Sequence, residues 1–276
     1  MLWILVLFMV LLPIALYVLI YTSTNAQIDA IRSGRVQAPG GPQQIRQLED
    51  LIASLRPARL PDMAMGLVFP IAAILAIVLA GSTTGNEFGW GTVRTVLTHV
   101  PRRVAFLAAK LVSLAGAGVA LVVAGFGAAL VASVVVALMS GADLSVPGDF
   151  AGRLLLNIGK VGYVTLPYVA FATMVAVLAR SAAGGIGFGL VLFFGESLIS
   201  GIAIQLNRDL RPLFDAGIAR NVSTITRASV VAEGVPPPPL AHPAEAGLAY
   251  LILALYVVAF VAIAVHRIAK RDLTLA

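Results

Sequence analysis

The chain has 276 residues, of which 59% are hydrophobic and only 12% charged. Soluble domains carry about twice that charged fraction. The low charge and a mean hydropathy of +0.97 together exclude a soluble globular protein. The net charge of +6 comes without a run of five basic residues, which argues against nucleic-acid binding. The absence of cysteine excludes disulfides, thiol catalysis and thiolate metal sites.

Six apolar runs have the length of about 20 residues that crosses roughly 30 Å of hydrocarbon. They predict an all-α polytopic membrane protein, with residues 1–276 forming a single transmembrane domain. The alternation typical of β-barrel strands is absent. The expected spans are Leu2–Thr22, Met63–Gly81, Leu111–Met139, Val161–Ala179, Gly184–Gln205 and Gly247–Val265.

The first run has no basic segment before it and exceeds the 7–15 apolar residues of a secretory signal. We therefore expect a retained helix rather than a signal peptide. The third run is too long for one upright helix and too short for two helices with a turn. Because Lys110 shifts its apolar part downstream, we expect a tilted helix or one that continues from the preceding connector.

Two segments on the outer side have apolar residues at helical spacing. "PGGPQQIRQLEDLIASLRPARLP" follows the first span and predicts a short amphipathic helix near the outer interface. A second such segment follows the fifth span and precedes the stiff spacer Pro236–Pro239. The stripes are Ile45, Leu48, Leu51, Ile52 and Leu55 in the first segment, and Leu213, Phe214, Ile218, Val222 and Ile225 in the second.

The connector between the second and third spans, "NEFGWGTVRTVLTHV", predicts a two-faced helix over about residues 86–100. Asn86 can cap its start, Glu87 suits the positive end of its dipole, and Pro101 lies beyond its last turn. The apolar face holds Trp90, Val93, Val96, Leu97 and Val100, and the opposite face holds Glu87, Gly91, Arg94, Thr95 and Thr98, with Phe88 projecting from the polar side.

The same geometry fits two roles for this connector. It could be a membrane-surface helix that only joins two spans, or a helix that docks into a cleft of a soluble partner, with Glu87 and Arg94 supplying complementary charge. Trp90, Arg102, Arg103 and Lys110 are the expected anchors at the membrane interface. The short inner segments are dense in Lys and Arg, which places both termini in the cytoplasm.

Glu196 lies well inside the fifth span, where a carboxylate must face protein or water. It could line a transport pathway, bond to another helix, or reach water at the outer boundary. Glycines in the third and fifth spans allow close helix approach: Gly116, Gly118, Gly125, Gly127, Gly184, Gly185, Gly187 and Gly189. His99, His242 and His266 are scattered, so no metal site and no catalytic residue is predicted.

The stretch "NEFGWGTVRTVLTHVPRRVAFLAAKLV" resembles the signature of type-2 ABC permeases, the six-span membrane subunits of many bacterial ABC exporters. The matching positions are Glu87, Gly91, Thr92, Arg94, Leu97, Pro101, Arg103 and Lys110. "LPYVAFATMVAVLARSAAGGIGFGLVLFFGESL" resembles the fourth and fifth spans of that family, with Arg180 in the inner turn and Glu196 late in span five. The resemblance runs from Met63 to Leu198.

This resemblance implies that the chain is a permease and that its connector is a coupling helix. The ATPase-docking residues would be Glu87, Phe88, Gly91, Thr92, Arg94 and Thr98. The sequence has no G-x-x-x-x-G-K-[ST] loop, so ATP and Mg²⁺ are expected on a separate ATPase subunit, in two copies, and no cofactor on this chain. The permease would dimerise, with itself or a related chain, in the bacterial plasma membrane.

Export by alternating access follows from the family alone, and no motif identifies the substrate. Family members usually begin with a basic amphipathic segment before the first span, whereas this sequence begins inside that span. Either the start lies upstream or this member lacks that segment. The alternative is an ATP-independent secondary transporter or a membrane assembly anchor. A secondary transporter should show internal repeats with broken helices or paired intramembrane charges, and the sequence shows neither.

Overall fold

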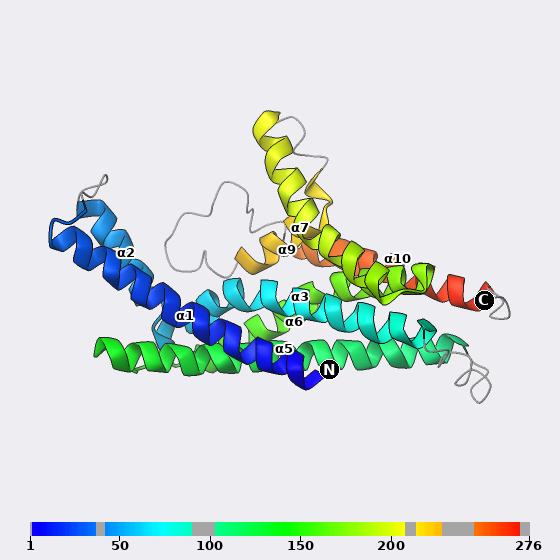
Figure 1. The fold of residues 1–276 in the computed structure, drawn as a ribbon, viewed down its shortest axis with the longest axis horizontal. Helices are drawn as coiled ribbons and strands as arrows, with labels where there is room; N and C mark the ends of the chain where they lie inside the picture. Colours follow the sequence, from blue (N-terminus) through cyan, green and yellow to red (C-terminus); the bar gives the residue numbers. More distant parts are fainter. Residues whose placement is uncertain (1, 37–41, 90–102, 208–213, 228–245, 271–276) are drawn as a thin grey trace. The chain divides into compact units, whose positions relative to one another are not determined.

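The computed structural model describes residues 2–36, 42–89, 103–207, 214–227 and 246–270, which are mostly helical and contain no strand (Figure 1). The elements are α1 (Leu2–Arg32), α2 (Pro42–Ser54), the 3₁₀ turn η1 (Pro57–Arg59), α3 (Leu60–Gly89), α5 (Arg103–Ser140), α6 (Phe150–Ala179), α7 (Ala182–Leu206), α9 (Ile218–Arg227) and α10 (Ala246–Lys270). Six of them, α1, α3, α5, α6, α7 and α10, are long and apolar enough to cross a membrane. The predicted all-α class is confirmed for the described residues, and the six long apolar helices indicate an integral membrane protein.

Each of the six helices continues past the apolar run that predicted it. For example, α1 extends from the predicted end at Thr22 to Arg32, and α6 begins at Phe150 rather than Val161. A hydropathy run marks only the part of a helix that suits hydrocarbon, whereas polar residues can continue the same backbone outside it. The third run lies in one unbroken helix of 38 residues, which begins on the connector side at Arg103.

The chain divides into two compact units, one with residues 1–71 and 121–159 and the other with residues 72–120 and 160–276. In the first unit, α1, α3 and α5 meet at Gly125. A Cβ atom there would overlap the side chain of Met9 and lie 3.0 Å from Cγ1 of Val68. The missing side chain of Gly125 therefore allows Met9 to be completely buried.

A polar network joins α3 and α6 in the first unit. The Arg153 guanidinium lies 3.4 Å from Oδ2 of Asp62, and the amide of Asn157 donates to Oδ1 of Asp62 (3.1 Å) and to the Pro61 carbonyl (3.0 Å). Asp62 lies in the first turn of α3, where the helix dipole favours a negative charge. The network fixes the start of α3 against the first turns of α6.

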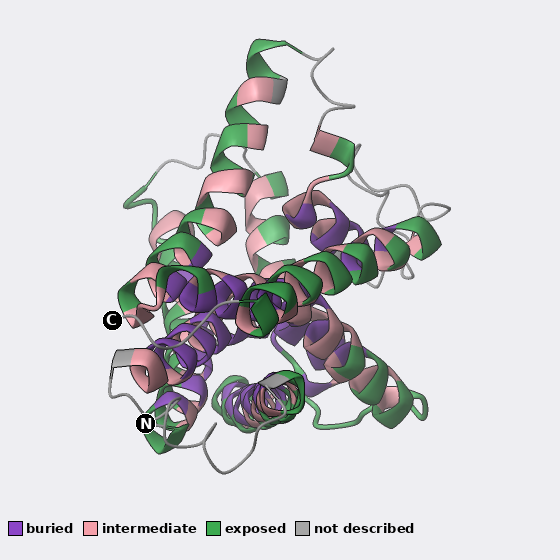
Figure 2. Cartoon of the chain, turned by 90° about the vertical axis from the view of Figure 1, so that its right-hand side faces the viewer, coloured by how far each residue is buried: buried purple, intermediate pink, exposed green. Residues whose placement is uncertain are grey.

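In the second unit, α5, α6 and α10 share an apolar cluster. Leu107, Met174 and Ala264 are its buried centre, and the rings of Phe171 and Phe260 pack edge to face at 5.2 Å between centroids. The long helices carry both buried and exposed residues (Figure 2), although in α7 the buried residues lie only near its start. Of the six spans, α7 is the least buried, with apolar side chains such as Phe194 and Leu198 exposed.

The segment expected after the fifth span is helical over a shorter stretch than its stripe suggested. The helix α9 is separated from Phe214 by a turn and lies against α7 and α10. Its stripe residues Ile218, Val222 and Ile225 are buried within the protein. The stripe therefore packs on other helices instead of lying on lipid, and Leu213 is outside the described residues.

Glycines bring the backbones of α3 and α7 into contact. A Cβ atom on Gly81 would lie 2.7 Å from the backbone nitrogen of Ile186, and one on Gly185 would lie 2.9 Å from the carbonyl oxygen of Ala172 in α6. Gly125, Gly184, Gly185 and Gly189 thus make the close approaches expected of them. Gly116, Gly118, Gly127 and Gly187 have no described atom of this chain within 4 Å of such a Cβ, so the expectation for these four stays a prediction.

Substitution of Gly185 by alanine tests the crossing of α3 and α7. We expect Gly185→Ala to lower the free energy of unfolding by about 1–3 kcal/mol, because the added methyl group meets backbone that cannot rotate away. Gly187→Ala, two residues along the same helix, should leave stability unchanged or raise it by up to about 1 kcal/mol, because alanine favours the helix more than glycine does. Thermal unfolding of the detergent-purified variants measures both. Equal loss of stability in the two variants would contradict the crossing.

Candidate functional site

The connector over 90–102 lies outside the described residues, but the helices on either side of it are described. The predicted helix start at Asn86 is wrong, because Asn86–Gly89 form the end of α3. The polar residues before it do not end the helix. Ser82 and Thr83 donate their hydroxyls to the Val78 and Leu79 carbonyls at 2.6 and 2.7 Å, which satisfies them within the helix.

Glu87 therefore lies in the last described turn of α3. The charge is balanced by Lys110 of α5, which forms an ion pair with Glu87. The Lys110 ammonium also donates to the Thr83 carbonyl in the last turns of α3 (3.0 Å). Lys110 thus neutralises the carboxylate and adds a second bond between α5 and α3.

Burial makes the loss of either partner of this ion pair more costly than in a surface pair. The Lys110 side chain is only 9% exposed and that of Glu87 31%, so removing either partner leaves a poorly hydrated charge. The ring of Phe106, one turn before Lys110, lies 5.9 Å from the ammonium. We refer to Thr83, Glu87, Phe106 and Lys110 as the α3–α5 clamp.

The turn between α6 and α7 lies against the same end of α3. A Cβ atom on Gly85 would overlap the backbone nitrogen of Ala182, the first residue of α7. Arg180 ends α6 in the left-handed region with φ 51°, and the Ser181 amide donates to the Ala176 carbonyl (3.3 Å), as in a Schellman cap. The Ser181 hydroxyl then accepts from the Gly184 amide and caps α7.

The structure thus brings together two of the predicted site residues, Glu87 and Lys110, in the α3–α5 clamp. Phe88 lies in the last turn of α3 and is half-buried, so it does not project from a separate helix, and Arg103 begins α5. The remaining predicted docking and anchor residues lie outside the described residues: Trp90, Gly91, Thr92, Arg94, Thr98 and Arg102. Sequence reasoning missed the pairing, although both charges stand in the stretch that carries the family resemblance.

Glu196 makes a contact between helices. Its Oε1 atom accepts from the backbone N–H of Ala219 at 3.0 Å, which connects α7 to the start of α9. Its Oε2 atom is buried with no hydrogen-bond partner among the described residues. Sequence analysis left three roles open for Glu196: lining a transport pathway, bonding to another helix, or reaching water. The contact with Ala219 corresponds to the bond with another helix.

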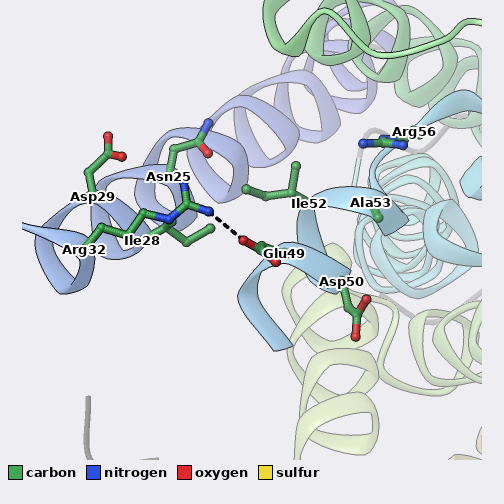
Figure 3. Close-up of a pocket in the computed structure, with 9 residues that line it drawn as sticks. All are labelled: Asn25, Ile28, Asp29, Arg32, Glu49, Asp50, Ile52, Ala53 and Arg56. Carbon is green, nitrogen blue, oxygen red and sulfur yellow. Dashed lines mark hydrogen bonds and ion pairs between the residues drawn. The ribbon is translucent and has the colours of Figure 1, made fainter. Parts of the chain in front are cut away.

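A cleft of about 450 Å³ lies in the first unit, between the end of α1 and α2. The Arg32 guanidinium donates to Glu49 across it at 2.7 Å. Figure 3 shows Asp29 and Asp50 pointing away from each other on opposite sides, with Arg56 apart from both. The charges do not converge on one point, so the cleft lacks the arrangement of a ligand site. No group of three or more His, Asp or Glu that could hold a metal ion occurs in the described ranges.

A double-mutant cycle tests the α3–α5 clamp. We expect Glu87→Gln and Lys110→Met each to lower the free energy of unfolding by about 1–3 kcal/mol, because each leaves a buried polar group without its partner. The double variant should lose less than the sum of the two, with a coupling of about 0.5–3 kcal/mol. Glu49→Gln is the control, because the Arg32–Glu49 pair is 60% and 48% exposed and should contribute less than about 1 kcal/mol. Additive losses in the cycle would argue against a direct interaction.

Comparison with known proteins gives a family but no named relative. No curated protein and no solved structure matches the chain. A family model described as "Protein of unknown function (DUF2705)" matches residues 53–274. That match extends from the end of α2 to the residues after α10 and covers well over half of the sequence. The chain therefore belongs to the DUF2705 family.

Proposed function

We propose that this chain is the membrane-spanning permease subunit of an ABC exporter and that a separate ATPase subunit drives transport by alternating access. The observation that carries the proposal is the α3–α5 clamp, which joins the two helices next to the connector. Force applied to that connector reaches both helices together, because an ion pair and a lysine–carbonyl bond join them. The contact of Gly85 with the start of α7 extends the connection to a third span.

This geometry refines the proposed docking residues. Glu87 is engaged by Lys110, so its role is to orient the connector rather than to contact the ATPase. Phe88, Gly91, Thr92, Arg94 and Thr98 are then the contact residues, and Trp90, Arg102 and Arg103 hold the connector at the headgroup level. Aromatic and arginine side chains often contribute most of the binding energy at a protein interface, and Phe88 and Arg94 are of these two kinds.

The rest of the assembly follows from this function. Both termini and the connector face the cytoplasm of a bacterial cell, and α2 and α9 belong to the outer side of the plasma membrane. Two permease chains, identical or related, bind two ATPase subunits that hold ATP and Mg²⁺, and this chain hydrolyses no ATP itself. The exposed apolar faces of α7 and α10 are available to lipid and to the second permease.

Co-purification with an ABC ATPase encoded in the adjacent reading frame tests the proposal. We expect Phe88→Ala to weaken ATPase binding roughly tenfold or more, because a buried aromatic anchor contributes about 2 kcal/mol to an interface. The yield of ATPase retained on the tagged permease and the transport-stimulated hydrolysis of ATP are the two measurements.

Phe8→Ala is the matched control, because Phe8 is an exposed phenylalanine of α1, outside the α3–α5 clamp and outside the exposed faces of α7 and α10. It should retain the ATPase as the parent chain does. Full retention and normal stimulated hydrolysis in Phe88→Ala would refute docking through this residue. If the parent chain bound no ATPase at all, an ATP-independent transporter or an assembly anchor would replace the proposed function.

A further inference from the structure

The start of α9 lies alongside the interior of α7 rather than at its end (Figure 1). Glu196, which contacts Ala219 at the start of α9, is ten residues before the end of α7 at Leu206. At 1.5 Å per residue this is about 15 Å along the helix axis. The apolar stretch of α7 ends at Ala203, so the contact lies about 10 Å inside it.

Backbone groups at that depth need partners within the protein. The first N–H groups of a helix have no intrahelical acceptor, and in hydrocarbon each unsatisfied group costs several kcal/mol. The carboxylate of Glu196 accepts from the Ala219 amide at 3.0 Å. Its negative charge lies at the positive end of the α9 dipole, which stabilises it further.

Gly217 makes room for this contact. A Cβ atom at Gly217 would overlap Oε1 of Glu196 and lie 3.0 Å from the Phe214 carbonyl. Any larger residue at 217 therefore moves the carboxylate away from the start of α9. The contact depends on two residues from different segments, one in α7 and one in the turn before α9.

Arg220, Asn221 and Thr224 of α9 also have partners nearby in the chain. Arg220 forms an ion pair with Asp215 and is 15% exposed. The Asn221 amide donates to the Asp215 and Gly217 carbonyls at 3.0 and 2.7 Å, and the Thr224 hydroxyl donates to the Arg220 carbonyl at 3.1 Å. Charged and polar side chains at membrane depth are found in such paired arrangements.

We propose that Glu196 is a positioning residue whose carboxylate anchors the start of α9 inside the apolar layer, so that α9 is a re-entrant helix reached from the outer side. The buried stripe Ile218, Val222 and Ile225 holds α9 against α7 and α10, and Glu196 sets its depth. This inference requires a membrane but no ATPase partner, so its outcome is separate from that of the proposed function.

The absence of cysteine makes a single reporter thiol sufficient to measure the depth of α9. Ser223→Cys replaces one hydroxyl of α9 by a thiol, and Ser145→Cys places the same reporter in the exposed loop between α5 and α6, which by helix order lies on the same side. In sealed proteoliposomes, a membrane-impermeant maleimide should label Ser223→Cys at least about tenfold more slowly than Ser145→Cys. A reporter in hydrocarbon has no contact with the reagent and forms little thiolate.

Variants of the anchor then separate position from general stability. Glu196→Leu and Gly217→Ala should raise the labelling rate of Ser223→Cys about tenfold, because α9 loses its acceptor. Glu196→Gln keeps one acceptor oxygen and should remain near the parent rate. Gly201→Ala is the control for Gly217→Ala, because a Cβ at Gly201 meets no described atom within 4 Å. Thermal unfolding and gel filtration identify any variant that fails to fold, and labelling rates are compared only among the variants that fold.

Two outcomes would overturn the inference. Rapid labelling of Ser223→Cys in the parent chain would place α9 at the water-exposed surface. Unchanged labelling in folded Glu196→Leu would show that Glu196 does not hold α9. Both measurements use the permease alone, so they do not depend on whether the chain binds an ATPase.

Discussion

Hydrocarbon offers no hydrogen bonds, so every polar backbone group within a membrane must find its partner inside the protein. This constraint explains why six helices account for the spans and why helix ends carry the informative contacts. In the last described turns of α3, the Lys110 ammonium balances the charge of Glu87 and bonds to the Thr83 carbonyl. At the start of α9, the Glu196 carboxylate accepts from the Ala219 amide. An anion at the start of a helix is the arrangement that the helix dipole favours.

Packing between spans depends on backbone proximity as much as on side chains. The crossing of α3 and α7 is built from Gly81, Gly85 and Gly185, where a single methyl group would meet backbone. Lipid tails are as apolar as leucine, so close van der Waals packing replaces the hydrophobic effect between such helices. The apolar cluster around Leu107 and Met174 shows the other solution, in which larger side chains fill the space between α5, α6 and α10.

Hydropathy predicted the number and approximate place of the spans, because burial in hydrocarbon leaves a strong compositional signal. It did not predict where the helices end, since Ser82 and Thr83 satisfy their own hydroxyls and let α3 run on through Asn86. The pattern over residues 86–100 predicted a new helix that begins at Asn86, whereas Asn86 and Glu87 lie within α3. Its partner Lys110 lies in the next span, and a contact between helices leaves no local periodicity in a single sequence. The stripe of α9 was visible in the sequence, but whether lipid or protein covers a stripe depends on the fold.

The length of α5 has a consequence for access to the connector. A helix of 38 residues is about 57 Å long, and even at a tilt of 40° a hydrocarbon layer of roughly 30 Å takes up only about 39 Å of it. About 18 Å, or some twelve residues, must therefore project beyond the lipid tails. The charges of α5, Arg103 and Lys110, are both in its first eight residues, so the excess length belongs at that end. The first turns of α5 therefore pass out of the hydrocarbon through the headgroup level, so that a water-soluble protein can bind to the start of the helix without entering the hydrocarbon.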